Sequence, residues 1–559
     1  MKENEWKNAV VYQIYPKSFN DTNGDGIGDL PGIIDKLDYL KDLGIDIIWL
    51  SPFFPSPMAD NGYDISDYQG IEPSFGTMED MDRLLEEADR RDIRIVIDLV
   101  LNHTSDEHDW FKESSASLDN PKRDWYIWRS GDENGEPPNN WRSNFGGSAW
   151  EWDERTNQYY LHVFDKKQPD LNWENKEMRQ AVYQMIHWWM EKAVAGFRVD
   201  AITYIKKNKE FPSFEADGSD GMVTIDKGSL NQPGIKKHLQ ELKEKGFRHD
   251  EVFTVAEAPG VPADEIEDYI GEHGFFTMLF EFDHVDLDLT ASAKWYEMKE
   301  WTVHDFKKPL FDSQRRLQEG WSALYIENHD QPRSLSRFIQ EGFRHTHSAK
   351  MLAAVYFLMK GTPYIYQGQE IGMTNVEYPD ISSYNDAVSR HQYDYALANG
   401  CSEEEALAFI WKRSRDNTRT PMQWDASHQG GFTEGSPWLE TNSNYPEVNV
   451  ETVKAAPDSL YTFYQKLIAF RKHAKAAPII EKGAFQALLE EDDHIVAYKR
   501  TYEDQEITLY ANFTAERVPV SFDEESRQAI VSNNDGLGPE SAWMEPYDFV
   551  IFSNVDYEW

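Results

Sequence analysis

Acidic residues close four apolar runs of this chain, and their placement suits a site built from carboxylates. The runs IVIDLVLNH, GFRVD, FTVAE and LYIENHD carry the acidic residues Asp98, Asp200, Glu257 and Asp330 at or near their ends. In a barrel of parallel strands the C-terminal ends face one common mouth, so carboxylates there converge although they lie far apart in sequence. Converged carboxylates can act as nucleophiles or exchange protons, and we therefore predict an active site at that mouth.

The barrel itself is predicted from the alternation of short β-type runs with helical segments. Eight strands are expected, at residues 10–15, 45–50, 93–101, 196–200, 252–257, 277–282, 323–327 and 363–367. Amphipathic helices are expected between them, including 33–43, 78–90, 175–192 and 348–359. The predicted fold class is α/β, a (β/α)8 or TIM barrel.

Two stretches do not fit the barrel pattern. Residues 104–172 are rich in Trp, Asn, Asp, Gly and Ser, which predicts a subdomain inserted over the mouth after the third strand. From about Gly483 the alternating segments 494–498 and 507–512 predict a C-terminal antiparallel β-sandwich domain. The predicted boundaries are 1–103 and 174–482 for the barrel, 104–173 for the inserted subdomain and 483–559 for the β domain.

Composition limits the cellular setting and the partners. The single cysteine, Cys401, excludes an intrachain disulfide, and the first residues lack the basic start and apolar stretch of a signal peptide. No run approaches the length of a membrane span, so we expect a cytoplasmic protein. The 99 acidic against 56 basic residues give a net charge of -43, which disfavours nucleic acid and membrane partners. This acidity fits either ordinary solubility or adaptation to high salt.

Several fragments together resemble one enzyme family. DLVLNH, GFRVDAIT, TVAEAPG and ENHD, joined by QPDLN at 168–172, are similar to the ordered signature segments of glycoside hydrolase family 13, the α-amylase family. QPDLN resembles its oligo-1,6-glucosidase and α-glucosidase subgroup. Matches at VVYQIYPKSF, NGYDISDY, TPYIYQGQEIGMTN and RDNTRTPMQW extend the resemblance over nearly the whole chain. It implies a retaining α-glucosidase capable of transglucosylation.

The resemblance also implies catalytic roles. Retaining cleavage of a glycosidic bond uses a nucleophilic carboxylate and a protonated carboxyl about 5 to 5.5 Å apart. Asp200 is the implied nucleophile, Glu257 the general acid and then base, and Asp330 a third carboxylate that holds the distorted sugar. Arg198, two residues before Asp200, is expected on the same strand face, where it would keep the nucleophile ionised. The apolar sequence neighbours of Glu257 are expected to raise its pKa.

Binding of the terminal glucose is likewise implied by the resemblance. The residues that match the family's hydroxyl contacts are Asp60, Tyr63, His103, Arg198, His329 and Arg415. Asp60 and Arg415 match a pair that closes the pocket around one non-reducing sugar, which implies an exo-acting enzyme. Tyr63 and Phe164 are expected to offer apolar faces to the sugar. We expect an oligosaccharide substrate, no cofactor for the chemistry, and a monomer or weak homo-oligomer.

The segment DTNGDGIGD has the spacing of a cation-binding loop. Its candidate ligands are Asp21, Asn23, Asp25, the Ile27 carbonyl and Asp29. The twelfth position is Gly32, where an EF-hand needs a bidentate Glu, so the match to that motif is partial. We expect a structural Ca²⁺ or Mg²⁺ on the first strand-to-helix loop, as in relatives, with a metal-free loop of Asx turns as the alternative.

Two positions are used to predict which glycosidic linkage the enzyme cuts. The residue after the implied nucleophile is Ala201; in the subgroup Val accompanies α-1,6 cleavage, whereas Ala or Thr accompanies α-1,4 cleavage. Glu327 also departs from the Asn associated with the α-1,6 enzymes. We therefore expect an α-1,4, maltose-type glucosidase, with an isomaltose-type oligo-1,6-glucosidase as the alternative.

Other activities remain further alternatives. Trehalose-6-phosphate hydrolase is not excluded by the sequence. A sucrose isomerase is disfavoured because SLSRFIQEGFRH lacks an RLDRD-like run. A non-enzymatic sugar-binding relative, such as a transporter-associated subunit, would need a membrane span or a broken triad, and neither is found.

Overall fold

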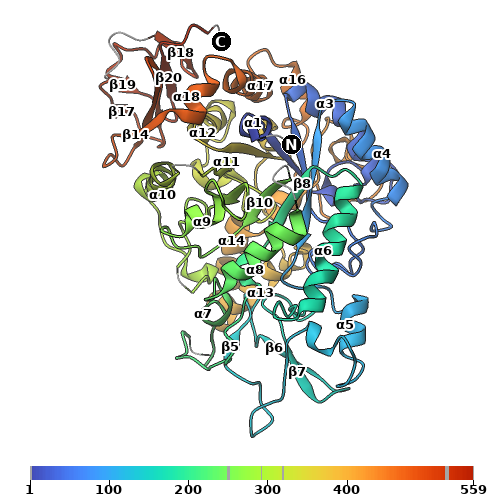
Figure 1. Cartoon of the computed structure of the whole chain (residues 1–559). Helices are drawn as coiled ribbons and strands as arrows, with labels where there is room; N and C mark the ends of the chain where they lie inside the picture. The colour runs from blue at the N-terminus through green and yellow to red at the C-terminus, as the bar shows by residue number, and fades with distance from the viewer. Residues whose placement is uncertain are drawn as a thin grey trace.

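The computed structural model describes residues 3–218, 220–248, 252–290, 292–317, 320–522, 528–557 and 559. At its centre lies a barrel of parallel strands (Figure 1): β1 (Val11–Ile14), β2 (Ile47–Leu50), β3 (Arg94–Val100), β8 (Gly196–Asp200), β10 (Phe253–Glu257), β11 (Met278–Phe280), β12 (Ala323–Leu324) and β13 (Thr362–Tyr366). Their order in the sheet is β11-β10-β8-β3-β2-β1-β13-β12. A parallel bridge between Leu279 and Ser322 joins β11 to β12 and closes the ring. The predicted (β/α)8 barrel is confirmed, and each strand overlaps its predicted range.

Alternate side chains of each strand face the inside and the outside of the barrel. One buried cluster gathers the inward-facing apolar residues, among them Val11, Ile47, Trp49, Val96, Val255, Met278, Phe280 and Tyr364. Their neighbours, such as Ile48, Ile97 and Ile365, belong to the larger cluster shared with the helices. Near the C-terminal ends of β3, β8 and β10 the inward register reaches Asp98, Arg198, Asp200 and Glu257. The barrel therefore brings charges together above an apolar core.

Helices cover the outside of the barrel. They include α4 (Met78–Asp89), α6 (Lys176–Glu191), α8 (Ile235–Glu241), α9 (Ile266–Ile270), α10 (Val303–Arg316), α12 (Thr346–Phe357) and α17 (Leu460–Lys472). The next helix, α18 (Ala477–Lys482), packs against α17 and the C-terminal sheet. The helix predicted over 33–43 is two helices, α2 (Leu30–Asp35) and α3 (Leu37–Leu43), which meet at Lys36. The first begins earlier than predicted because the Asp29 carboxylate caps it by accepting the Gly32 N–H.

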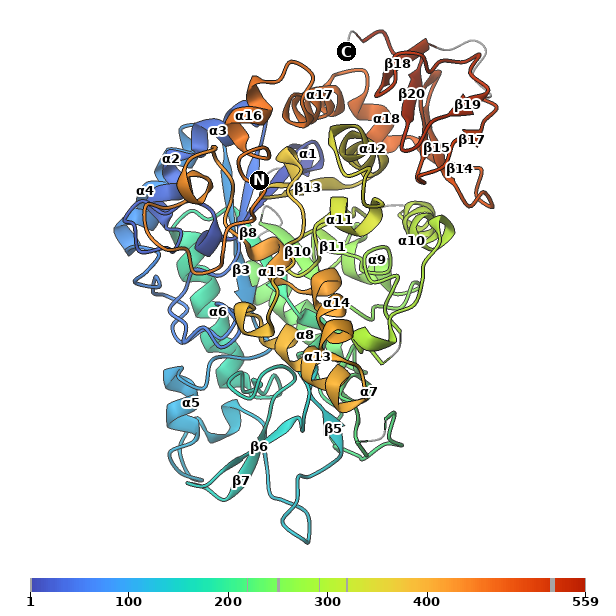
Figure 2. The ribbon, with the colours of Figure 1, turned by 180° about the vertical axis from the view of Figure 1, so that it is seen from behind.

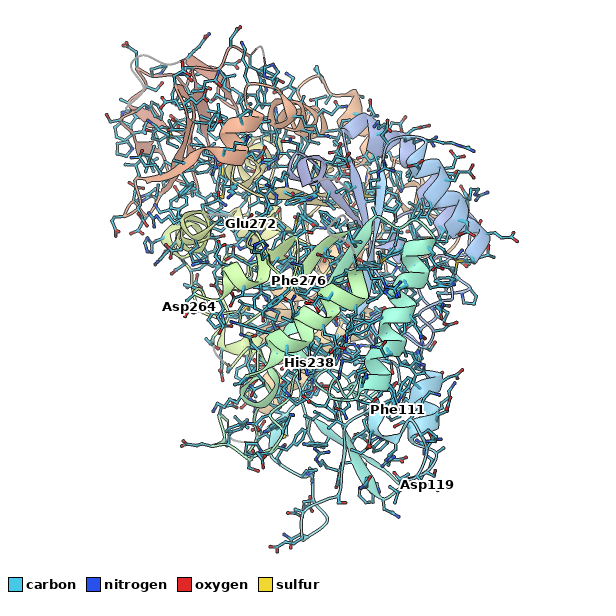
Figure 3. The ribbon with its side chains drawn as sticks, viewed as in Figure 1. Phe111, Asp119, His238, Asp264, Glu272 and Phe276 are labelled. Carbon is cyan, nitrogen blue, oxygen red and sulfur yellow. The ribbon has the colours of Figure 1, made fainter. Side chains whose placement is uncertain are left out.

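The residues between β3 and α6 form a separate small unit at one end of the barrel (Figure 1). It contains α5 (Asp109–Ser114), β4 (Trp128–Arg129), β5 (Trp141–Arg142), β6 (Trp150–Asp153) and β7 (Gln158–Leu161), with β4, β7 and β6 in one antiparallel sheet. Phe111, labelled in Figure 3, stacks on Trp128 at 5.6 Å between ring centroids and also contacts Tyr126 and Tyr160. Strand β5 pairs with β9 (Val223–Thr224), which follows β8, so the inserted part is also tied to a later segment.

The C-terminal part is an antiparallel sheet, as predicted. Its order is β14 (Ala484–Leu488), β15 (Ile495–Tyr502), β16 (Gln505–Asn512), β20 (Phe549–Ser553) and β18 (Gln528–Ser532). The short pair β17 (Val518–Pro519) and β19 (Trp543–Met544) stands beside it. Figures 1 and 2 place this sheet and the inserted part at opposite ends of the molecule.

A helical excursion follows β13 and was not foreseen from the sequence. It contains α13 (Ala387–Ala398), α14 (Glu403–Arg413), α15 (Asp416–Arg419) and α16 (Val450–Ala455). In Figure 2, α13 and α14 run across the front of the barrel toward the inserted part. Within the described part of the chain, no helix is both long and apolar enough to cross a membrane.

Candidate active site

One guanidinium group at the barrel mouth holds three carboxylates. Arg198 on β8 places Nη1 2.9 Å from Oδ1 of Asp98 on β3 and 2.5 Å from Oδ1 of Asp200. Its Nη2 lies 2.8 Å from Oε2 of Glu257 at the end of β10. Asp98 is the register partner of Arg198, and Asp200 lies two residues further along the same strand face. Asp200 and Glu257 thus contact two nitrogens of one group, an arrangement that favours the short carboxyl separation of a retaining enzyme.

The surroundings of Glu257 suit an acid that keeps its proton near neutral pH. Burial raises the pKa of Glu257 to about 7; Arg198 opposes this shift, and the charges of Asp200 and Asp330 add to it. Burial also raises the pKa of Asp200, again against the effect of Arg198. A carboxyl group with a pKa near 7 can donate a proton and later accept one at physiological pH.

Asp330 is held in its ionised form. Burial by itself raises its pKa, but His329, Arg415 and Arg419 outweigh burial and hold the pKa of Asp330 well below its usual range. Arg419 Nη2 lies 2.7 Å from Oδ1 of Asp330, and His329 Nε2 lies 3.1 Å from Oδ2. The His329 ring is fully buried and stacks on Tyr63 at 5.3 Å. Asp330 therefore supplies a fixed negative charge at the mouth.

Asp60 and Arg415 form a charged pair at the same mouth. Arg415 Nη2 lies 2.9 Å from Oδ1 of Asp60 and 2.7 Å from Oδ1 of Asp386. The second oxygen of Asp60 accepts a hydrogen bond of 3.1 Å from Gln168 Nε2, so the QPDLN segment reaches the site through its first residue. Burial raises the pKa of Asp60 to about 6, and Arg415 opposes that shift. Both oxygens of Asp60 are thus oriented.

These side chains surround one cavity of about 190 Å³. It is lined by Asp60, Tyr63, His103, Phe145, Phe164, Asp200, Ala201, Tyr204, Glu257, Pro259, Asp330 and Arg415. Of the predicted catalytic and binding residues, all but Arg198 and His329 line it. Those two lie behind the lining, where Arg198 holds Asp200 and Glu257 while His329 holds Asp330.

Three aromatic or apolar lining residues were missed by sequence reasoning. Phe145 comes from the inserted part, Tyr204 from the turn after β8, and Pro259 from the loop after β10. The Phe164 ring links two of them, at 5.7 Å from Phe145 and 5.6 Å from Tyr204. Such rings form an apolar wall that can pack against a sugar face. Pro259 could have been found from the sequence, because it lies two residues after Glu257. The position of Phe145 could not, because it depends on how the insertion folds.

Glu327 does not face the cavity. Its carboxylate lies 3.1 Å from Arg333 Nη1 and accepts a hydrogen bond of 2.6 Å from the Ser334 backbone N–H. It thereby stabilises the start of α11 (Ser334–Phe338). From the sequence, Glu327 was taken to indicate α-1,4 preference. The position of Glu327 in the structure does not support that interpretation.

Ala201, by contrast, lines the cavity in an unusual backbone conformation. Its φ of 41° and ψ of 37° lie in the left-handed region, which residues other than glycine adopt at a cost. Its backbone N–H donates a hydrogen bond of 3.0 Å to Oε2 of Glu257. The strained turn thus helps to orient the acid and leaves only a methyl group beside Asp200.

The predicted cation loop closes through hydrogen bonds within itself. Asp21 Oδ1 accepts the Gly24 N–H at 2.9 Å, and Asp29 Oδ1 accepts the Gly32 N–H at 2.7 Å. These are Asx-type contacts that a loop can make without a metal. Nowhere in the described residues do three or more His, Cys, Asp or Glu side chains converge as ligands. A cation bound by Asp21, Asn23, Asp25, Ile27 and Asp29 therefore stays a prediction.

Comparison with known proteins agrees with this geometry. Residues 13–482 match the family model described as the α-amylase catalytic domain. The chain is 48% identical over 565 residues to a probable oligo-1,6-glucosidase 3 of Bacillus subtilis (strain 168), which covers 99% of this chain and 100% of the relative. It is 47% identical over 561 residues to an oligo-1,6-glucosidase of Bacillus cereus, with the same coverage.

A solved structure is similar over nearly the whole chain. The crystal structure of a Bacillus licheniformis trehalose-6-phosphate hydrolase mutant superposes with a TM-score of 0.91 at 41% identity, covering 98% of this chain and 99% of that one. Sequence and fold therefore agree from the barrel through the C-terminal sheet.

Proposed function

The chain belongs to the α-amylase family of retaining glycoside hydrolases, and from this premise we propose an exo-acting α-glucosidase. In this proposal it releases one glucose at a time from the non-reducing end of short α-1,6-linked glucosides such as isomaltose. The observation that carries the proposal is the convergence of Asp200, Glu257 and Asp330 on one cavity, with Arg198 joining the first two.

Each carboxyl group has a step in the proposed reaction. Asp200 attacks the anomeric carbon while Glu257 gives its proton to the glycosidic oxygen, so the aglycone leaves as an alcohol and a glucosyl ester forms on Asp200. Glu257, now ionised, takes a proton from water, and the resulting attack restores Asp200 and frees glucose with its configuration retained. A second sugar in place of water gives transglucosylation. Asp330 contributes a negative charge beside the sugar as positive charge develops at the anomeric carbon.

The exo-action is supported by the pair of Asp60 and Arg415. Arg415 is held by Asp60, Asp330 and Asp386 together, which fixes its guanidinium at the cavity wall. Charged hydrogen-bonding groups with fixed directions recognise vicinal hydroxyl groups well. A pocket closed in this way accepts the end of a chain but not its middle.

The α-1,6 linkage replaces the α-1,4 linkage expected from the sequence. Relatives named oligo-1,6-glucosidase share close to half of their residues with this chain over its full length. Of the two sequence features that favoured α-1,4 cleavage, Glu327 faces away from the cavity and only Ala201 lines it. We keep α-1,4 activity as the second candidate because of Ala201.

Trehalose 6-phosphate has less support as a substrate. Among the residues that line the cavity, Arg415 is the one Lys or Arg, and three carboxylates already contact it. A phosphate group would thus meet a wall with four acidic residues, Asp60, Asp200, Glu257 and Asp330, and no free cation.

Initial rates of glucose release test this proposal. Isomaltose, maltose, sucrose, trehalose and trehalose 6-phosphate are compared side by side at equal concentration. We expect isomaltose to be cleaved fastest. Faster cleavage of maltose would restore the α-1,4 assignment, and no release from any of them would overturn the glucosidase assignment.

A further inference from the structure

The hydroxyl group of Tyr204, a residue that lines the cavity, is held by two side chains from outside the barrel. It donates a hydrogen bond of 2.8 Å to Oδ1 of Asp226 and accepts one of 3.1 Å from Nδ2 of Asn144. Neither partner lines the cavity. The hydroxyl group is therefore fixed by groups outside the cavity, while the ring forms part of its wall.

The pairing of β5 with β9 brings Asn144 and Asp226 together. The two strands are parallel, and their last residues, Arg142 and Thr224, lie opposite each other. Asn144 and Asp226 each come two residues later, so both side chains emerge at the same end of this two-stranded ribbon. Asp226 also begins α7 (Asp226–Ser229), which Figures 1 and 2 both show beside β5. The inserted part and the segment after β8 thus meet at that hydroxyl group.

Tyr204 stands at the end of the cavity where the acid lies. It belongs to the turn after β8, and its backbone N–H donates to the Ala201 carbonyl at 3.0 Å. The Ala201 N–H donates in turn to Oε2 of Glu257 at 3.0 Å. Glu257 protonates the glycosidic oxygen in the proposed reaction, so the leaving sugar lies beside it. The non-reducing end is closed elsewhere, by Arg415 with the Phe145 ring 5.3 Å from its guanidinium.

We propose that Tyr204 is a specificity-determining residue that positions the aglycone sugar, with Asn144 and Asp226 as positioning residues that act through its hydroxyl group. The ring offers the leaving sugar a flat apolar face, and the two hydrogen bonds fix the orientation of that face. A second sugar that replaces water occupies the same place, so the ring positions the acceptor in transglucosylation as well. This inference rests on the proposed glucosidase function.

Variants separate the ring from its two hydrogen bonds. Tyr204→Phe keeps the ring and removes both bonds, and Tyr204→Leu removes the flat face. Asp226→Ala and Asn144→Ala each remove one partner, whereas Asp226→Asn keeps an oxygen that accepts from the hydroxyl group. Tyr160→Phe is the matched control, because Tyr160 lies on β7 of the inserted part, donates a hydrogen bond of 2.7 Å to the Lys166 carbonyl and does not line the cavity.

The readout is kcat/KM on isomaltose divided by kcat/KM on α-glucosyl fluoride, which carries the same glucosyl group but no aglycone sugar. We expect Tyr204→Phe to lower this ratio by roughly three- to ten-fold, the scale of a lost hydrogen bond. Tyr204→Leu should lower it by roughly ten-fold or more. Asp226→Ala and Asn144→Ala should shift it in the same direction, and Asp226→Asn and Tyr160→Phe should stay near wild type.

Transglucosylation gives a second readout. With glucose added as acceptor, the share of glucosyl groups transferred to sugar rather than to water should fall in the same variants that lower the ratio. Thermal unfolding shows whether each variant is folded. If Tyr204→Leu does not fold, Tyr204→Phe and the two Asp226 variants carry the test.

Three results would overturn the inference. The first is an unchanged ratio in the folded Tyr204 variants. The second is an equal loss of kcat/KM on both substrates, which is what a merely structural role predicts. The third is the same fall of the ratio in Tyr160→Phe. Failure of the proposed function looks different, because the wild-type protein would then release neither glucose from isomaltose nor fluoride from α-glucosyl fluoride.

Discussion

Replacement of Ala201 by valine should change both the stability of the protein and its choice of linkage, and the two effects can be measured separately. Ala201 has a left-handed backbone, which costs an L-residue about 1–2 kcal/mol and costs a β-branched residue more. We therefore expect Ala201→Val to lower the free energy of unfolding by about 1–3 kcal/mol. The left-handed backbone therefore adds an effect on stability to the effect on specificity that the sequence suggests for Ala201.

The two added methyl groups also enter the cavity beside Asp200. Steric exclusion on this scale is worth roughly 1 to 3 kcal/mol, so the ratio of maltose to isomaltose efficiency should fall by roughly ten-fold or more. A shifted backbone would also disturb the bond from the Ala201 N–H to Glu257, but that loss affects both substrates and cancels in the ratio. Ala201→Gly is the control, since it relieves the left-handed strain and keeps the space.

The assay combines thermal unfolding with kcat/KM on the two disaccharides for wild type, Ala201→Val and Ala201→Gly. A ratio that stays level in Ala201→Val, or that moves toward maltose, would show that Ala201 does not select the linkage. Unchanged stability of Ala201→Val would refute the assigned backbone strain.

Four further perturbations have definite expected outcomes. Because burial raises the pKa of Glu257 to about 7 and the acid must carry a proton, kcat/KM on isomaltose should fall as the pH rises above about 7. Glu257→Gln should abolish this fall in kcat/KM at alkaline pH, and it should slow the cleavage of isomaltose far more than that of a nitrophenyl glucoside. Equal losses of kcat/KM on both substrates would argue against Glu257 as the acid. If a cation binds the Asp21–Asp29 loop, a chelator should lower the melting temperature and added Ca²⁺ should restore it, with little change in turnover at low temperature; an unaltered melting temperature speaks against the metal. Sodium chloride up to about 1 M should raise the melting temperature because it screens the self-repulsion of a chain with a net charge of -43, and a flat salt dependence would contradict this reasoning.

The barrel could be predicted from the sequence because its strands are buried on both faces. Runs such as 93–101 are mostly apolar and are followed by polar residues, here Asn102 and His103, which is typical of parallel strands between a core and helices. Strand β12 is shorter than predicted because the chain leaves the sheet after Leu324 and Glu327 caps the next helix instead. The excursion through α13 and α14 could not be told from the outer helices of the barrel, because the spacing of apolar residues predicts a helix in both cases.

Strand register decides the position of only part of the candidate site, and the other site residues were named from the resemblance to the α-amylase family. Asp200 and Glu257 follow from the ends of β8 and β10, but the contacts of Arg198 with Asp98 and Glu257 depend on pairing between strands. Phe145 and the partners of Arg415 depend on how two long connections fold over the mouth, and no local pattern encodes that. The raised pKa of Glu257 was expected from its apolar neighbours in sequence. Burial at the mouth raises it, with Asp200 and Asp330 adding to the shift.

Trapping the covalent intermediate tests the central claim most directly. In Glu257→Gln, an α-glucosyl fluoride needs little protonation to react with the nucleophile, while the missing base slows hydrolysis of the ester. The glucosyl-enzyme should therefore accumulate. Mass spectrometry of the digested protein should show one added glucosyl group on the peptide that contains Asp200, and Asp200→Asn should abolish it. A glucosyl group on another residue, or fluoride release with no adduct, would contradict the assignment of Asp200 as nucleophile and Glu257 as acid and base.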